Sequence, residues 1–546
     1  MSGSTWLEVF GDIVFRFTRS ATEHYNPEEP EFTAESFGYD PLQSTGREWY
    51  YLPVDELIYQ EYSDKDIRSF AYLSSSSLDV QVINACSPED SAEEGNQENR
   101  QEEDKEMAWK QLRPPALQTL VKAMYIGGLI SLLAASIVGA IYTLLSYLNY
   151  KTVWNCEFVH QGELISARMQ WMRTIADIIG CIFYYACPVL NLLFLFRPHQ
   201  LKGIKTKLIL VSFLMYCFDA IFCAVLQVFG KPFFQLPDLY RSLANALLFV
   251  LNIFTVCVQF YFVARHLLIT PRGRVASLLC KMAVPSCCAL IAAFVIRYAI
   301  YTAYNKQDTE GKLVIAIFSP LMGVVVKAIS RICVQRLWNI THPGYSYVLL
   351  SPLYCLLSVM FRVLQAELDS LQSIAVLGII HGFAEVVERS TVVVIDHLCH
   401  QLCIGESLPW GSFRTPRRER LTADIIIMSM LFESTAIVSV NGLLYLYQFI
   451  FLERNDSSLE LLQSFAIHTS VPLVIEWFFN SVSVAIVTRY KNIAVMAVWR
   501  KQWKRHILVA IVNVLPAALW TGGNLLVILH ERFDGPVTQS CKMPFT

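Results

Sequence analysis

The sequence predicts an all-α, polytopic transmembrane helix bundle of about eleven helices, preceded by a disordered, acidic N-terminal tail. Three observations support this fold class. Only 16% of the 546 residues are charged and 54% are hydrophobic, whereas soluble proteins carry roughly 25% charged residues. Long runs without a formal charge recur along the chain. Charge is also unevenly divided, since residues 1–110 hold 24 Asp and Glu against 8 Lys and Arg, and the remainder holds 22 against 36.

The uneven charge predicts three parts. Residues 1–110 form an acidic, largely disordered cytosolic tail, because 75–106 combine a serine run with a Glu-rich stretch that offers little to a core. Residues 111–530 form the transmembrane helical domain, and 531–546 form a short C-terminal tail. The N-terminus has no basic segment before an apolar one, so we expect no cleavable signal peptide. The first membrane helix then acts as an internal signal anchor.

The membrane domain opens with a run of 28 uncharged residues, 123–150, which exceeds the ~20 residues that cross the hydrocarbon core as a helix. Later runs are similar in length, or are interrupted by single charges. Backbone amides in lipid must be satisfied within their own segment, so these runs are read as helices. The predicted spans are 124–148, 175–196, 208–229, 242–265, 282–303, 313–332, 345–364, 371–395, 424–451, 464–488 and 507–529.

Loop charges predict how the chain is oriented. With the tail in the cytosol, the inner loops, which include 331–336, carry 20 Lys and Arg, and the outer segments carry 10. Positive residues concentrate on the cytoplasmic side, so we expect a cytosolic N-terminus and an extracellular or luminal C-terminus. Asn455 begins an Asn-Asp-Ser sequon in an outer loop and is a glycosylation candidate. Cys156 and Cys541 would both lie outside and are a disulfide candidate.

The eighth span is the most informative one, because ionisable residues recur along a stretch that is otherwise apolar. At 100° per residue they fall within about 120° of the helix circumference. From the first to the fifth of them the helix rises about 22 Å, which is most of the apolar thickness. A charge at this depth costs several kcal/mol unless it is paired or faces water. These residues are His381, Glu385, Glu388, Arg389, Asp396 and His400.

Two interpretations of this stripe compete. In the first, it lines a polar pathway through the bundle. In the second, the apolar helix ends near Ala384, and the rest is a cytosolic extension with a solvated face. The stripe holds three acids and only one arginine, so it lacks positive charge. Residues of other helices that could supply it are Arg297, Lys327 and Arg362. Asp177 and Asp219 are further ionisable residues inside predicted spans. The candidate pathway residues are His381, Glu385, Glu388, Arg389, Asp396, Glu433 and Glu476.

Motifs for enzyme chemistry are scarce. There is no phosphate-binding loop, nucleophile elbow, kinase signature or zinc-ligand spacing, so we expect no cofactor or metal and favour a protein that is not an enzyme. One constellation is an alternative: Trp338-Asn339 is followed 42 residues later by His381-Gly382. In these two dipeptides and in helix number the chain is similar to membrane-bound O-acyltransferases. That resemblance implies a catalytic pair of His381 and Asn339, although the residues around both dipeptides depart from the family.

The function that the sequence favours is a transporter or permeation pathway for an ion or a polar solute. The alternatives are a membrane-bound acyltransferase-like enzyme and a non-catalytic receptor or scaffold that signals through the acidic tail. Expected partners are the lipid bilayer, the ion or small polar solute, and cytosolic proteins that bind the tail. Nucleic acid is not an expected partner, because no basic patch has interleaved aromatic residues.

Overall fold

The computed structural model of the protein describes most of the predicted membrane domain. The described residues are 116–154, 165–196, 200–229, 238–267, 272–337, 341, 344–366, 371–404, 416–451, 458–491, 493 and 495–532. The predicted acidic tail lies outside them, as does the predicted C-terminal tail beyond Arg532.

The predicted fold class is confirmed, because all regular elements in the described part of the chain are helices. Two of the helices contain a π-helical segment, which does not interrupt the rod. The elements are α7 (Ala116–Leu133), η2 (Ala134–Gly139), α8 (Ala140–Thr152), α9 (Ala167–Leu195), α10 (Lys205–Val228), α11 (Asp238–Leu267), α12 (Arg272–Val295), η4 (Ile296–Ile300), α13 (Tyr301–Asn305), α14 (Thr309–Gln335), η5 (Ser346–Leu349), α15 (Ser351–Ala366), α16 (Leu371–Ile404), α17 (Pro416–Phe451), α18 (Ser458–Lys491) and α19 (Val495–Arg532).

These elements make eleven continuous helices in the described residues, since α7–η2–α8 and α12–η4–α13 each run on as one. Ten are long and apolar enough to cross a membrane, and α15 is a shorter apolar helix. The protein is therefore a multi-pass integral membrane protein. Most helix ends differ by several residues from the predicted bounds, and two of these differences affect helices α14 and α15. The seventh helix begins at Ser351 because a 3-10 turn precedes it, and α14 continues to Gln335, which places Arg331 in a helix and not in the predicted inner loop.

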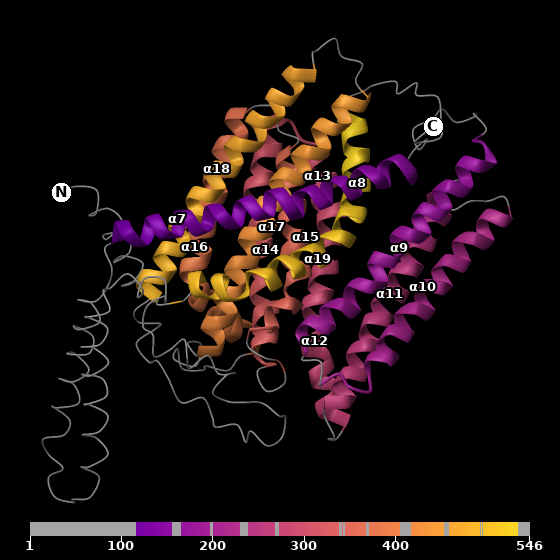
Figure 1. Ribbon diagram of the computed structural model, residues 1–546, viewed down its shortest axis with the longest axis horizontal. Helices are drawn as coiled ribbons and strands as arrows, with labels where there is room; N and C mark the ends of the chain where they lie inside the picture. The colour runs from indigo at the N-terminus through magenta and orange to yellow at the C-terminus, as the bar shows by residue number, and fades with distance from the viewer. Residues whose placement is uncertain are drawn as a thin grey trace, which may run out of the picture.

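Burial separates a central helix from peripheral ones. In the most apolar stretch of α17, 89% of the residues are buried, whereas the corresponding share in α16 is 22%. A helix that is apolar on all sides is buried either in protein or in lipid, and protein surrounds most of α17. Figure 1 shows α17 near the middle of the bundle, where α15, α18, α19 and the first helix pack against it, while α9, α10 and α11 stand together at one side. The polar face of α16 is thus turned inward, and its other face is left to lipid.

The first helix crosses the bundle at a steep angle to α17 and α18 (Figure 1). It is held by polar contacts to each of the helices α17, α18 and α19. The Trp477 indole donates to the Met124 carbonyl at 2.8 Å, and the Ser434 hydroxyl donates to Ser131 at 3.0 Å. Further along, the Tyr142 hydroxyl is hydrogen-bonded to Thr521 of α19. These buried hydrogen bonds fix the crossing, because an unmet polar group in this environment is costly.

Candidate functional site

The ionisable face of α16 lies against four neighbouring helices. Glu385 and Arg389 contact α17, Arg389 also reaches α18, and Glu388 and Asp396 contact α14. His381 contacts α14 and α15. Arg389 is only 6% exposed and Asp396 4% exposed. The ionisable face of α16 beyond Ala384 is therefore packed against neighbouring helices and is not a solvated face.

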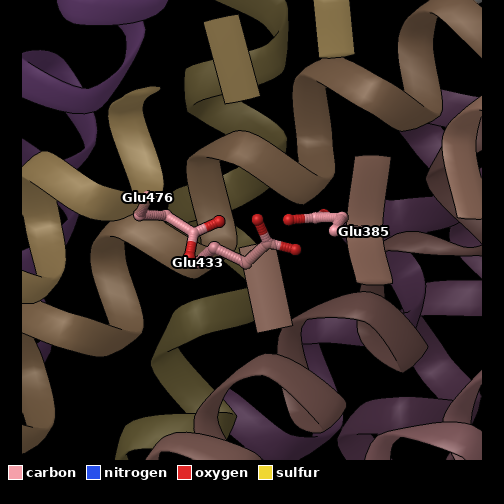
Figure 2. Close-up of side chains that lie close together, drawn as sticks. All are labelled: Glu385, Glu433 and Glu476. Atoms are coloured by element: carbon pink, nitrogen blue, oxygen red, sulfur yellow. The ribbon is translucent and has the colours of Figure 1, made fainter. Parts of the chain in front are cut away.

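Three carboxylates from three different helices meet at the centre of this face. Glu385 of α16, Glu433 of α17 and Glu476 of α18 each offer an oxygen atom, and these atoms all lie within 4.8 Å of one another. Figure 2 shows the three side chains directed toward one another, with Glu433 in the middle. We call these three residues the carboxylate cluster. Like charges this close repel strongly in a membrane interior unless something positive lies between them.

Arg389 supplies one positive charge to the cluster. Its guanidinium is paired with Glu385 one helical turn away and lies 3.4 Å from Glu433. It also donates to the Asn480 side-chain oxygen. The Ser429 hydroxyl lies 2.7 Å from the Glu433 carboxylate and 3.0 Å from that of Glu385, so it bridges the two. One arginine and one serine therefore hold two acids from different helices.

Arg362 of α15 supplies the second positive charge. Its Nη2 lies 2.5 Å from Glu476 Oε2, while Asn480 donates to Glu476 Oε1 at 3.1 Å. Arg362 also donates to Gln365 at 2.7 Å. Asn480 thus contacts both arginine–carboxylate groups, and the network joins α15, α16, α17 and α18. Networks of this kind are strongly coupled, because each buried member depends on the others for its partners.

The charges of this network do not balance. Three carboxylates face two guanidinium groups, which leaves one negative charge if all five are ionised. The side chains of Glu385 and Glu433 are each 14% exposed, whereas that of Glu476 is 3% exposed. A single proton or a monovalent cation would neutralise the excess. A divalent ion fits less well, since the two arginines already occupy much of the carboxylate surface.

A second group of ion pairs lies further along α16 and is electrically balanced. Lys327 Nζ is 3.2 Å from Glu388, and Arg331 donates to Asp396 through Nε at 3.0 Å and Nη2 at 2.8 Å. The Tyr354 hydroxyl accepts from Arg331 at 3.1 Å. Two bases and two acids leave no excess charge here. We infer that this group ties α16 to α14, and that the excess charge belongs to the carboxylate cluster alone.

His381 has protein partners on both ring nitrogens. The Gln365 side-chain amide lies 2.5 Å from Nδ1, and the Ala316 carbonyl oxygen lies 3.2 Å from Nε2. A carbonyl accepts only, so Nε2 carries the hydrogen and Nδ1 accepts from the amide. A general base needs a free nitrogen within reach of its substrate. This arrangement orients His381 as a neutral side chain that holds three helices together, and it offers no support for the acyltransferase alternative.

The structure thus brings all seven candidate pathway residues into two adjoining networks. Of the candidate partners, it places Lys327 and Arg362 on the stripe, and nothing is described for the side chain of Arg297. Arg331 was missed because its charge was counted with the inner loop 331–336, although the predicted span 313–332 also includes it. Its signal was its spacing of four residues from Lys327, which puts both on one helical face. Asn339, Asn455, Cys156 and Cys541 lie outside the described residues.

Comparison with known proteins adds no further assignment. No protein-family model matches the chain, and neither a curated protein nor a solved structure matches it. The bundle and its buried ionic networks are therefore the basis for any functional conclusion.

Proposed function

We propose that this protein transports an ion or a polar solute across the membrane, and that the carboxylate cluster is the position where a cation binds on the way. The observation that carries the proposal is the convergence of three carboxylates, Glu385, Glu433 and Glu476, on only two guanidinium groups deep in a helical bundle. Ionisable groups inside membrane segments typically mark ion pathways or proton relays, because their cost is otherwise hard to offset.

Partial exposure supports the same interpretation. Glu385 of α16 and Glu433 of α17 each keep 14% of their side-chain surface exposed, although both carboxylates lie inside the bundle. This exposure suits a pathway, since a permeating ion must exchange its hydration for protein ligands in steps.

Orientation and partners are part of the proposal. The two-fold excess of Lys and Arg in the predicted inner loops favours a cytosolic N-terminus and an outer C-terminus. The acidic tail would then meet cytosolic partners, while the bilayer surrounds the bundle. The permeating species is a proton or a monovalent cation in this proposal, because either one cancels the excess charge of the cluster.

The experiment is a flux measurement on the full chain reconstituted into lipid vesicles. A pH-sensitive dye inside the vesicles reports protons, and tracer uptake reports Na⁺ and K⁺. We expect flux above that of protein-free vesicles for at least one of these ions. Glu433→Gln removes the excess charge and should reduce that flux to the protein-free level. The matched control is Glu310→Gln, an exposed glutamate at the start of α14, which should leave flux unchanged.

Two outcomes would contradict the proposal. One is the absence of any flux above background for protons, Na⁺ and K⁺ in vesicles whose protein is folded and correctly inserted. The other is a flux that Glu433→Gln and Glu385→Gln both leave intact, because the ion would then not pass through the cluster.

A further inference from the structure

Two helices that carry the ionic networks have a proline in their interior. Pro320 lies within α14 and Pro472 lies within α18. Proline has no backbone N–H, so it cannot donate to the carbonyl of the residue four positions before it. These carbonyls belong to Ala316 in α14 and His468 in α18. Each needs another donor, because an unmet backbone group is costly in a membrane interior.

Side chains of neighbouring helices supply the missing donors. The His381 imidazole of α16 donates from Nε2 to the Ala316 carbonyl oxygen at 3.2 Å. The Asn441 amide of α17 donates to the His468 carbonyl oxygen at 3.1 Å. The Ser319 hydroxyl also donates to the Ala316 carbonyl, at 3.5 Å, but it belongs to α14 and does not join two helices. His381 and Asn441 therefore hold the two proline-containing helices against their neighbours.

Both prolines act on the same side of the carboxylate cluster. The helices α14, α16 and α18 run in one direction, because successive residues of one lie beside successive residues of the next. The pairs are Ala316 with His381 and Lys327 with Glu388, then Gly378 with Ile475 and Gly382 with Phe479. His381 precedes Glu385 by one turn, and Pro472 precedes Glu476 by one turn. The two carbonyls therefore lie on the side where these helices begin, which the loop charges predict to be the outer side.

The two helix segments beyond these carbonyls are residues 309–316 of α14 and 458–468 of α18, and we call them the gate segments. Each is joined to the rest of its helix at a point that has one helical hydrogen bond fewer. Sharp bends in helices occur mostly at such points. If the side-chain donor let go of its carbonyl, the gate segment would be free to tilt, and the carboxylate cluster would open toward that side.

We propose that the two gate segments control access to the carboxylate cluster, and that His381 and Asn441 hold them in the closed position. The proposal rests on the transport function proposed above and assigns both side chains a positioning role. In the open position, water that enters between the helices binds the separated N–H groups and carbonyls in place of each other. The exchange of one protein contact for contacts with water makes the closure reversible, which a pathway with alternating access requires.

The test is hydrogen–deuterium exchange of the full chain in detergent, read by mass spectrometry on peptides from the gate segments. His381→Leu removes the donor to Ala316, so residues 309–316 should exchange about five- to thirtyfold faster. Residues 458–468 should exchange as in the wild type. Asn441→Leu should give the reverse pattern. His381→Gln keeps an amide that can donate, so it should restore part of the protection that His381→Leu loses.

Restoring the backbone donor tests the same gate in the opposite direction. Pro320→Ala and Pro472→Ala each provide an N–H for the carbonyl four residues earlier, so the adjoining gate segment should exchange more slowly. Ion flux into vesicles should fall by about fivefold, because opening now also breaks a helical hydrogen bond. The matched control is Pro188→Ala, an interior proline of α9, which carries none of the cluster residues. It should leave both gate segments and the flux unchanged.

The proposal is overturned if folded His381→Leu and Asn441→Leu leave the exchange of their gate segments unchanged. It is also overturned if the wild type transports an ion and both proline variants transport it equally fast. A wild type that moves no ion contradicts the transport function instead, and the exchange measurements then still decide whether His381 and Asn441 hold the two segments.

Discussion

Arg389→Met is expected to destabilise the folded protein by about 3–5 kcal/mol, the usual cost of removing one partner from a buried ion pair. The substitution keeps the length and apolar stem of the side chain but removes its charge. Glu385 and Glu433 then face each other with only Ser429 between them. The charge of the network changes from one excess negative charge to two, which is why the cost exceeds that of one lost hydrogen bond.

The measurement is thermal unfolding of the purified protein in detergent, followed by the fraction that stays monodisperse in size-exclusion chromatography. Arg265→Ala is the matched control, because Arg265 is an exposed arginine near the end of α11 that donates a hydrogen bond to Tyr261 one turn away. Its loss should shift the midpoint little, since exposed polar contacts contribute about 0–1 kcal/mol.

A double variant separates the charge effect from simple loss of contacts. Arg389→Met combined with Glu385→Gln restores the wild-type excess of one negative charge, so it should recover a large part of the lost stability. If the two substitutions instead destabilise additively, the charge balance of the cluster does not matter. That result would also weaken the proposal that the cluster binds a cation.

Much of this fold could be predicted from sequence because lipid leaves few alternatives. A run of 28 uncharged residues such as 123–150 is not expected in a solvent-exposed loop. It is long enough to cross the hydrocarbon core as a helix, the structure that satisfies its backbone hydrogen bonds within the segment. Helix ends were harder to predict. A charged residue such as Arg331 is usually expected in a loop. Arg331 is nevertheless helical and only 2% exposed, because Asp396 and Tyr354 accept hydrogen bonds from its guanidinium. A hydropathy scale scores the charge of an arginine but contains no information about the side chains that pair with it in the fold.

The candidate site could be predicted in part. Helical periodicity placed the ionisable residues of α16 on one face, and Glu433 and Glu476 stood out as single acids in apolar runs. Their convergence within 4.8 Å of Glu385 depends on how three helices pack, which periodicity does not encode. The uncharged polar residues of the network could not be predicted from the sequence for a similar reason. Ser429 and Gln365 are common residue types in membrane helices, and only their neighbours reveal their roles.

Packing of α16 against α18 sets the position of two members of the cluster, and it depends on Gly382. A Cβ atom added at Gly382 would lie 2.5 Å from Phe479 Cδ2 and 2.6 Å from Phe479 Cγ. At Gly378, one turn earlier on the same face, the added atom would lie 3.6 Å from Ile475, an ordinary contact distance. The two glycines therefore form a matched pair that differs in the room beside each.

Gly382→Ala is expected to destabilise the protein by about 1–3 kcal/mol, the range for forcing extra atoms into a packed core. Gly378→Ala should be tolerated, or slightly stabilising, because alanine favours a helix over glycine by about 1 kcal/mol. Both values are read from thermal or denaturant unfolding in the same detergent. Equal destabilisation by the two variants would show that the close approach at Phe479 is not the cause.

A second substitution, at Phe479, tests whether the carboxylate cluster depends on the distance between α16 and α18. Adding Phe479→Ala to Gly382→Ala removes the two nearest clashing atoms, so the double variant should be more stable than the sum of the single effects predicts. Gly382 lies one turn from Glu385, and Phe479 lies one turn from Glu476. A clash between residue 382 and Phe479 that pushes α16 away from α18 would therefore move the two carboxylates apart. If Gly382→Ala abolishes ion flux and Phe479→Ala restores it, the distance between α16 and α18 governs the site. If stability recovers and flux does not, Phe479 itself is needed to shape the pathway.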